Sequence, residues 1–397
     1  MAHQSSVNPT KLTRPGQDNA TGSARALYLK LFSGEMFKGF QRNTIARDLV
    51  TKRTLKNGKS LQFIYTGRTT AEYHTPGNSI LGNTDGAPPV SEKTITCDDL
   101  LVSSAFVYEL DETLAHYDLR GEISKKIGYA LAEKYDRLIF RSITQGARKV
   151  SPITKTNFKE PGGTQIRVGA AGTPAQSEAF NADNLIAAFY DAAAALDEKG
   201  ISTDGRVGVL NPRQYYELIQ KVGDGGLVNR DVQGSSLQSG NGVVEIAGIK
   251  IFKSMNIPFF DYYGVKYGIS GGPADPGRTG DFVNPQIESA KTGDTGIAAS
   301  GEGNSGYGQG LQKSDGTATG GDGNFNHSCG LIFQKEGAGV VEAIGPQVQV
   351  TSGDVSVIYQ GDVILGRLAM GAAPLNPAAA VELVCGKAAL SGNNAAF

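Results

Sequence analysis

The stretch Leu119–Gln145, LRGEISKKIGYALAEKYDRLIFRSITQ, is the longest helical pattern in the chain of 397 residues. Its apolar residues recur mostly at steps of three and four, which gathers them on one face of a helix. These residues are Ile123, Ile127, Ala130, Leu131, Leu138 and Ile143. Glu122 lies four residues before Lys126 and Glu133 four before Arg137. Each such pair adds about 0.2–0.5 kcal/mol to a helix.

Residues that typically begin and end a helix flank this stretch. Asp118 is placed to cap the N-terminus, and Gly146 is placed as the left-handed residue after the C-terminus, with Pro152 beyond it. At 1.5 Å per residue the helix is expected to be roughly 40 Å long. A helix of this length is typical of an extended subunit that spans its neighbours, although a long helix inside a compact domain gives the same pattern.

Composition excludes several classes of function. With 38 basic and 39 acidic residues, the chain has no overall charge that would draw it to nucleic acid or to a membrane. The three cysteines are isolated from one another, which favours a reducing compartment over a disulfide framework. No apolar run is long enough to span a bilayer. With 53 glycines, no tryptophan and four histidines, the chain is poorly equipped for acid–base or metal catalysis.

A basic stretch precedes the long helix. In LVTKRTLKNGKSLQFIY (residues 49–65), Asn57-Gly58 is flanked by β-prone runs and predicts a tight hairpin. The neighbouring positive residues are Arg42, Arg47, Lys52, Arg53, Lys56, Lys59 and Arg68, against Asp48 alone. A hairpin with so much like charge either protrudes into solvent or lies on an acidic surface.

An acidic stretch follows in the same chain and supplies such a surface. Its carboxylates are Asp98, Asp99, Glu109, Asp111, Glu112 and Asp118. Complementary charges within one sequence favour pairing between copies of the protein over binding to DNA. We therefore predict that Lys52, Arg53, Lys56 and Lys59 of one copy meet Asp98, Asp99, Glu109 or Glu112 of a neighbour.

The second half of the chain predicts a mixed α/β or α+β unit. Residues 181–200 form a clear amphipathic helix, with Asn181 or Asp183 as its cap and Gly200 at its end. A buried strand at 205–212, a helix at 212–223 and two strand-like pieces at 243–258 follow. Residues 264–326 are rich in glycine and polar residues and cannot bury enough apolar surface to order themselves. The chain is β-rich again from His327, with a hairpin signal at Ser352-Gly353-Asp354 and a last apolar run at Ala378–Val384.

Short motifs follow one another in a fixed order along the chain. Over residues 24–145 they are Leu27-x-Leu29-Lys30-x-Phe32-x-Gly34-Glu35, Gly58-Lys59-Ser60-x-x-Phe63, Gly67-Arg68-Thr69, Tyr73-x-x-Pro76-Gly77 and His116-Tyr117-Asp118-x-Arg120-x-Glu122. Near the C-terminal end they are Ala369-Met370-Gly371 and Leu375-x-Pro377-x-Ala379-Ala380. This ordered series resembles the major capsid proteins of short-tailed podophages of the T-seven type, and most of all a marine cyanophage member of that family.

The resemblance implies an α+β fold of the HK97-like class. It implies an N-terminal arm with a short helix (1–44), an extended hairpin called the E-loop (45–95), and a P domain (96–175) with a spine helix at 119–145. An A domain (176–339) would carry the glycine-rich insertion 264–326. Residues 340–372 would return to the P domain as strands, and residues 373–397 would complete the A domain.

The resemblance further implies a structural protein of the virion and no enzyme. Copies would form hexamers and pentamers of an icosahedral shell, T=7 in arrangement, around double-stranded DNA held without sequence specificity. A scaffolding protein and a portal protein would take part in assembly in the host bacterial cytoplasm, with no membrane and no cofactor. An encapsulin-type nanocompartment shell and a nucleic-acid-binding protein outside the capsid class are the alternatives.

Sequence matches to catalytic or metal motifs lack their required context. Gly268–Gly272 fits G-x-S-x-G, but the GPADPG that overlaps and follows it cannot start the helix of a nucleophile elbow. Gly301–Gly306 fits G-x-G-x-x-G without the flanking strand and helix that dinucleotide binding needs. Asp315 and Asp322 lack EF-hand spacing, and the histidines lack metal-ligand spacing. We therefore expect no catalytic, cofactor-binding or metal-binding residues.

Overall fold

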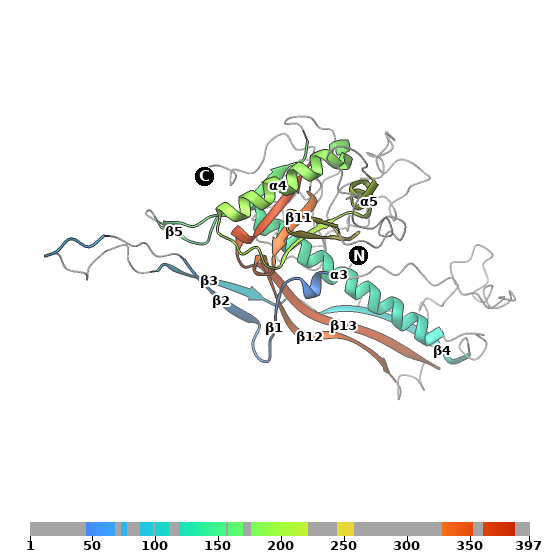
Figure 1. The fold of residues 1–397 in the computed structure, drawn as a ribbon. Helices are drawn as coiled ribbons and strands as arrows, with labels where there is room; N and C mark the ends of the chain where they lie inside the picture. Colours follow the sequence, from blue (N-terminus) through green and yellow to red (C-terminus); the bar gives the residue numbers. More distant parts are fainter. Residues whose placement is uncertain are drawn as a thin grey trace.

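The computed structural model describes residues 45–67, 73–77, 88–97, 100–110, 119–155, 158–169, 176–220, 244–257, 328–351 and 360–385. Within these ranges the chain forms two units that share one long helix, and a two-stranded ribbon extends from their junction (Figure 1). The expected arm and short helix at 1–44 and the glycine-rich segment 264–326, with its site-like motifs, lie outside the described residues.

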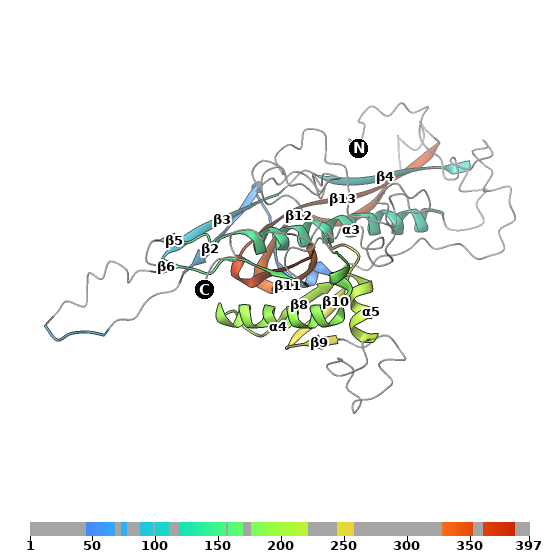
Figure 2. The same cartoon turned by 90° about the horizontal axis from the view of Figure 1, so that it is seen from above.

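Helix α3 (Leu119–Arg148) confirms the long helix that the sequence predicts, and it is 30 residues long. In its first half one face is buried, through Ile127 and Leu131, while Tyr129 remains exposed. From Tyr135 onward nearly every side chain is buried, whichever way it points. Figure 2 shows why: the first half lies against one sheet, whereas the second half is enclosed between that sheet and the second unit.

The expected end of the helix is wrong by one turn. Gly146 is not a left-handed cap, because α3 continues to Arg148. A Cβ at Gly146 would approach the Cβ of Pro374 to 3.0 Å, so glycine is needed there for close packing. Glu133 pairs with Arg137 as predicted. Glu122 contacts Lys125 at 3.4 Å in place of the predicted Lys126. The predicted cap Asp118 lies outside the described residues.

The first unit, called the plate here, consists of α3 and a four-stranded sheet in the order β1-β12-β13-β4. The strands are β1 (Thr51–Thr54), β12 (Ala338–Thr351), β13 (Gly361–Pro374) and β4 (Leu101–Tyr108). The antiparallel pairing of β12 with β13 agrees with the hairpin signal at 352–354, which itself lies outside the described residues. A Cβ at Gly366 would come within 2.3 Å of Ile127, so this glycine lets α3 lie close on β13.

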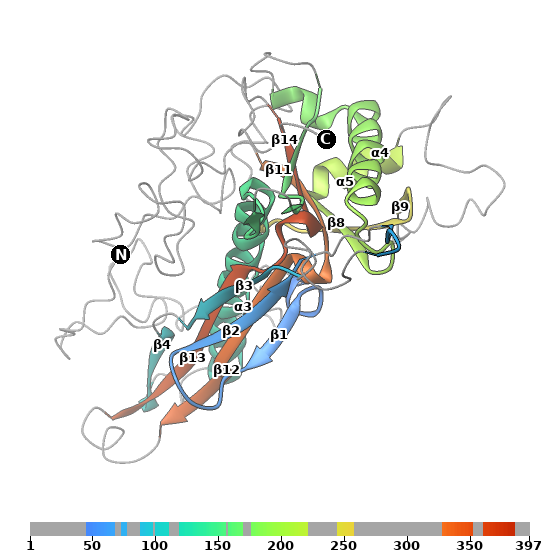
Figure 3. The ribbon, with the colours of Figure 1, turned by 90° about the vertical axis from the view of Figure 1, so that its left-hand side faces the viewer.

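The second unit is built on a six-stranded sheet in the order β7-β14-β11-β8-β10-β9. Its strands are β7 (Thr164–Arg167), β14 (Ala380–Val384), β11 (Ser328–Gln334), β8 (Arg206–Leu210), β10 (Ile249–Lys253) and β9 (Val244–Ile246). Helices α4 (Ala182–Glu198) and α5 (Pro212–Gln220) cover one face of this sheet (Figure 3). On the other face, Val207, Val209 and Phe333 join the core around α3. The sheet is therefore buried on both sides, as the apolar run at β8 predicts.

Local signals in the second unit behave as expected. The side chain of Asn181 caps α4 by accepting a hydrogen bond from the Asp183 N–H at 3.0 Å. Gly200 follows the helix with a φ of 69°. The remaining short elements are η2 (Ala46–Asp48), β5 (Thr154–Lys155), β6 (Phe158–Lys159), η3 (Gln176–Phe180), η4 (Lys335–Gly337) and η5 (Pro377–Ala379). Within the described ranges, no helix combines the length and apolar character needed to cross a bilayer.

The predicted hairpin across Asn57-Gly58 is wrong. Strand β1 pairs in parallel with β12, from Thr51↔Gly339 to Thr54↔Glu342. Strand β2 (Ser60–Thr66) instead pairs antiparallel with β3 (Val90–Thr96). The glycine supplies a φ of 91° where the chain passes from one sheet to the other. The turn at Asn57-Gly58 therefore connects strands of two different sheets. Pairing with the largely buried strand β12 takes the place of pairing between β1 and β2.

Strand pairing joins distant segments of the chain in each unit. Since β1 pairs with β12, it belongs to the plate, and the described ribbon begins at Ser60. Strand β7 pairs with β14, so residues 164–167 belong to the sheet of the second unit. The last apolar run does join the second sheet, as β14 between β7 and β11.

Gly371 allows the ribbon to meet the plate, and its replacement tests this contact. A Cβ there would fall 1.9 Å from the carbonyl oxygen of Thr96, a backbone atom that cannot move aside without shifting β3. We predict that Gly371→Ala lowers the free energy of unfolding by about 1–3 kcal/mol, as overpacking does. Urea unfolding measures the change.

Gly128→Ala provides the control for this prediction. A Cβ at Gly128, inside α3, meets nothing within 4 Å. Alanine there is expected to stabilise the chain by up to about 1 kcal/mol, because it favours the helix. Equal stability of the Gly371→Ala variant and the unsubstituted chain would contradict the assigned contact.

Candidate functional site

The two-stranded ribbon formed by β2 and β3 is the first feature with the character of a contact surface. Leu61, Phe63 and Tyr65 point to one face and are half-buried, while the residues between them are exposed. The outer face presents Ile64, which is 72% exposed, and Val90, which is 61% exposed. A lone two-stranded hairpin is at best marginally stable in water. Exposed apolar residues on such a ribbon therefore indicate a surface that another chain covers.

The ribbon is closed at both ends of its described pairing. At its root the Cys97 N–H donates to the Lys59 carbonyl at 2.8 Å, and at the far end the Gly67 N–H donates to the Pro89 carbonyl at 2.8 Å. Ile95 is fully buried and Thr96 lies over Gly371, so the ribbon is packed on the plate at its root. At the far end Pro89 is buried and Gly67 lies close to Ile153 and Glu160, so the ribbon is packed there too.

A groove of about 570 Å³ lies beside β2 and is lined by residues from both faces of the ribbon, from β1 and from the second unit. It is lined by Thr51, Phe63, Ile64, Tyr65, Thr66, Lys93, Glu160, Pro161, Lys199, Gly200, Ile201, Glu336, Leu375, Asn376 and Ala378. The charged groups balance, and Lys199 donates its Nζ to the Gly162 carbonyl at 2.7 Å. In the described part of the chain, no three histidine, cysteine or acidic residues form a group that could hold a metal.

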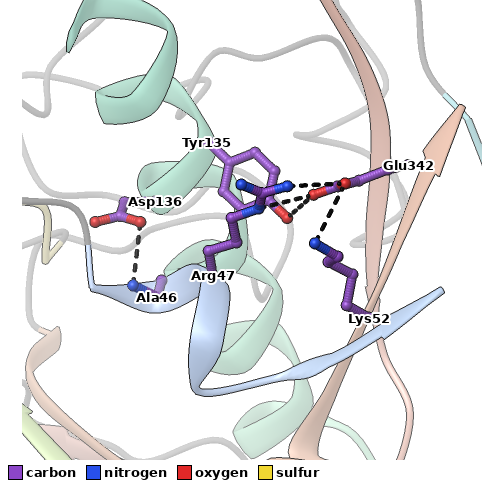
Figure 4. A network of polar contacts seen from close by, with 6 residues as sticks. All are labelled: Ala46, Arg47, Lys52, Tyr135, Asp136 and Glu342. Atoms are coloured by element: carbon purple, nitrogen blue, oxygen red, sulfur yellow. Dashed lines mark hydrogen bonds and ion pairs between the residues drawn. The ribbon is translucent and has the colours of Figure 1, made fainter. Parts of the chain in front are cut away.

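The segment that leads into the ribbon is fastened to the plate by a set of polar contacts, called the clasp here. Its first half is Asp136 on α3, which is fully buried. The carboxylate of Asp136 accepts hydrogen bonds from the N–H of Ile45 at 3.0 Å and from the N–H of Ala46 at 3.1 Å. Figure 4 shows the second of these. Burial raises the pKa of Asp136 from 3.8 to about 6, although these two hydrogen bonds and one from Asn256 oppose the shift.

The second half of the clasp is Glu342 on β12. Its carboxylate accepts the hydroxyl of Tyr135 at 2.6 Å and both Nε and Nη2 of Arg47, at 3.2 and 3.3 Å. Lys52 Nζ lies 3.6 Å from the same carboxylate (Figure 4). Burial works to raise the pKa of Glu342, but the hydrogen bonds from Tyr135 and Arg47 outweigh it, so the net pKa lies below its usual value. Adjacent residues of α3, Tyr135 and Asp136, thus hold one segment from two sides.

The structure places the predicted contact residues in different settings. Lys52 points inward to Glu342 of its own chain. Arg53, Lys56 and Lys59 are exposed where the chain passes from β1 to β2, and these three residues are called the corner below. Among the predicted acidic partners, Glu109 follows β4 and is exposed. The other three, Asp98, Asp99 and Glu112, lie outside the described residues.

The clasp was not predicted from the sequence, although one of its residues is conspicuous there. Its members Ala46, Tyr135 and Glu342 are separated by roughly 90 and 200 residues in the chain. Tyr135 and Asp136 belong to the helical pattern and Glu342 to a strand pattern, where a single acid in GVVEAIG is the only visible irregularity. A glutamate inside an otherwise apolar strand is a signal that a cation must reach it.

Comparison with known sequences gives a consistent result. A family model described as "Gp10A-like: Major capsid protein" matches residues 62–268. The chain is 29% identical over 201 residues to the major capsid protein of Escherichia phage T7, covering 50% of this chain and 58% of that protein. It is 30% identical over 131 residues to the major capsid protein of Enterobacteria phage T3, covering 33% of this chain and 38% of that protein. The chain thus spans about half the length, or less, of these curated relatives.

Solved structures extend the similarity over nearly the whole chain. The capsid structure of the cyanophage P-SCSP1u has a TM-score of 0.67 and 30% identity, and the match covers 91% of this chain and 94% of that one. The mature capsid of bacteriophage PhiM1 has a TM-score of 0.57 at 15% identity, covering 94% and 97%. These matches confirm the expected α+β fold of the HK97-like class.

The raised pKa of Asp136 predicts a dependence of stability on pH. The folded chain holds the proton more tightly than the unfolded chain, so this contribution is complete below pH 4 and is lost as the pH rises through about 6. The total is up to about 3 kcal/mol. We predict that Asp136→Asn removes this loss between pH 4 and 7 in urea unfolding of the unassembled chain.

The exposed carboxylate of Asp48, three residues from the clasp contact of Ile45, serves as the control. Asp48→Asn is expected to keep the pH dependence of the unsubstituted chain. A pH profile that is the same for Asp136→Asn and the unsubstituted chain would show that the Asp136 carboxylate is not held as the structure describes.

Proposed function

The chain belongs to the Gp10A-like family of major capsid proteins, and we propose that its copies assemble into the closed shell of a phage head. The observation that carries the proposal is the ribbon. It leaves the plate at its root, exposes Ile64 and Val90, and borders an open groove. These surfaces are costly in a free monomer and are useful to a chain that covers them with neighbours.

The two units and the ribbon correspond to the parts that the fold class provides for assembly. We propose that the ribbon is the E-loop, that the plate with α3 is the P domain and its spine helix, and that the six-stranded unit is the A domain. Residues 1–44 would form the N-terminal arm, and 264–326 an insertion in the A domain. The chain acts by assembly and not by turnover of a substrate.

The proposed shell is icosahedral and made of hexamers and pentamers, with T=7 as the expected arrangement. A closed shell of identical chains repeats each contact many times, so contacts that are weak individually become decisive together. A scaffolding protein would guide assembly and a portal protein would occupy one vertex. Double-stranded DNA would fill the interior without sequence-specific contacts. Assembly would take place in the cytoplasm of the host bacterium.

Within this shell we assign the corner to a contact between copies. Arg53, Lys56 and Lys59 are exposed together, and no described carboxylate of the same chain forms a recorded ion pair with them. Three like charges within one short stretch of chain, Arg53 in β1 and Lys56 and Lys59 after it, repel one another unless an acidic surface faces them. Lys52 of the predicted set pairs with Glu342 of its own chain, so this assignment rests on the other three residues.

The function is tested by negative-stain electron microscopy of the purified chain, alone and with a scaffolding protein. Closed shells or fragments with hexameric units are expected. A monodisperse monomer under both conditions would overturn the proposed function, and binding of the chain to DNA should then be measured.

Reversal of the corner charges tests the contact itself. We predict that Arg53→Glu/Lys56→Glu/Lys59→Glu prevents shell closure without unfolding the chain, because like charges would then face the acidic surface of the neighbour. The circular dichroism spectrum and unfolding midpoint should stay unchanged, since all three side chains are exposed. Normal shells from this variant would remove the corner from the assembly contacts and leave the shell function standing.

A further inference from the structure

The outer face of α4 carries a concentrated negative charge. Asp183, Asp191 and Glu198 are exposed, and Asp197 is 59% exposed. With 100° between successive helical residues, these four carboxylates fall within an arc of about 120°. The exposed residues between them are Ala187, Tyr190 and Ala194. The opposite face supplies Leu185, Phe189 and Leu196 to the core, so this outer face is the one that α4 turns away from its own unit.

Two carboxylates in the middle and at the end of this face, Asp191 and Glu198, form no ion pair with another residue of the described part of the chain. The carboxylate of Asp197 forms an ion pair with Arg206 at 2.7 Å. The Arg206 side chain is buried, whereas that of Asp197 remains exposed at the surface. Lys199, the next basic residue along the chain, is 2% exposed and turns its Nζ onto the Gly162 carbonyl.

Two of the carboxylates also stand where the helix itself disfavours them. The last turn of α4 contains Asp197 and Glu198 and no basic residue. The C-terminal end of a helix carries partial negative charge, so carboxylates there are repelled and cations are attracted. A cationic partner that binds Asp197 and Glu198 would therefore relieve their repulsion by the C-terminal end of the helix.

The corner offers the complementary surface on another part of the chain. Figures 1 and 3 show α4 in the second unit and the loop between β1 and β2 beside the plate, apart from each other, although the end of α4 at Lys199 borders the same groove as Thr51. Arg53 in β1 and Lys56 and Lys59 in the loop after it are exposed and basic, whereas α4 has an exposed acidic face. Because these complementary surfaces lie on separate parts of the chain, we expect them to meet between two copies, in a heterologous contact.

We propose that the acidic outer face of α4 in one copy receives the basic corner of a neighbouring copy. The small side chains of Ala187 and Ala194 leave room for long lysine and arginine side chains to lie along the helix. Ion pairs at such a surface fix the register and orientation of the two copies more than they add affinity. This contact rests on the proposed shell function and names the surface that the corner meets.

The test compares three variants by electron microscopy and light scattering of assembling protein. Asp191→Lys/Glu198→Lys reverses the helix face, Lys56→Glu/Lys59→Glu reverses the corner, and the third variant combines all four changes. Each reversal alone is expected to raise the protein concentration needed for shell formation by about tenfold or more, since a repulsive pair replaces an attractive one in every contact. The combined variant is expected to return to within about threefold of the unsubstituted chain.

Asp204→Lys/Glu245→Lys is the matched control, because it reverses two exposed carboxylates of the second unit that lie off this face. It is expected to assemble normally, and circular dichroism checks that every variant is folded.

Normal assembly of Asp191→Lys/Glu198→Lys, or failure of the combined variant to recover, would overturn the α4 contact while the shell function stands. If the neutral variant Asp191→Asn/Glu198→Gln assembles as poorly as the reversed one, the loss of contact and not the added repulsion is responsible, which supports the proposal. Absence of shells from the unsubstituted chain would overturn the shell function and this contact together.

Discussion

The ion pair between Arg148 at the end of α3 and Glu382 on β14 is the constraint on which the arrangement of the two units depends. Arg148 is 1% exposed and Glu382 is fully buried, and two hydrogen bonds of 2.7 and 2.5 Å join them. Gln165 on β7 donates to the same carboxylate at 2.7 Å. Removal of one member of a buried pair typically costs about 3–5 kcal/mol, because the other charge is left without a partner. The last turn of α3 is therefore bound to the second sheet, while its first turns lie on the plate.

The two carboxylates of the clasp show how environment separates chemically similar groups. Asp136 is fully buried and accepts only neutral donors from the described chain, so its pKa rises to about 6. Burial works to raise the pKa of Glu342, but hydrogen bonds from Tyr135 and Arg47, together with the positive charges of Arg47 and Lys52, lower it further than burial raises it. The raised pKa of Asp136 makes the folded chain less stable as the pH rises, whereas the lowered pKa of Glu342 makes it less stable as the pH falls. The segment between residues 45 and 52 is thus held by one group that favours acid and one that favours neutral pH.

Elements defined by local periodicity were predictable from the sequence, and so was the family, from its ordered motifs. The amphipathic patterns of α3 and α4 and the Asn181 cap all appear in the structure. Features that depend on distant partners were not predictable. The Asn57-Gly58 signal indicates a turn but cannot say which strands it separates, and β1 finds its partner in β12, more than 280 residues away. Gly146 looks like a helix stop because nothing in the local sequence reveals Pro374 beside it.

In the candidate site, too, local features were predictable from the sequence and contacts between distant residues were not. Exposed charges at the corner were visible as a run of basic residues, whereas the inward direction of Lys52 was decided by Glu342, far along the chain. The ribbon is packed at both ends of its described pairing, over Gly371 at its root and beside Ile153 and Glu160 at Gly67. Strand β2 has seven residues. At about 3.3 Å per residue it is a strut of roughly 23 Å that is supported at both ends. Any change in the direction of the ribbon must therefore also move Gly67 against Ile153 and Glu160, which couples the ribbon to the segment that follows α3.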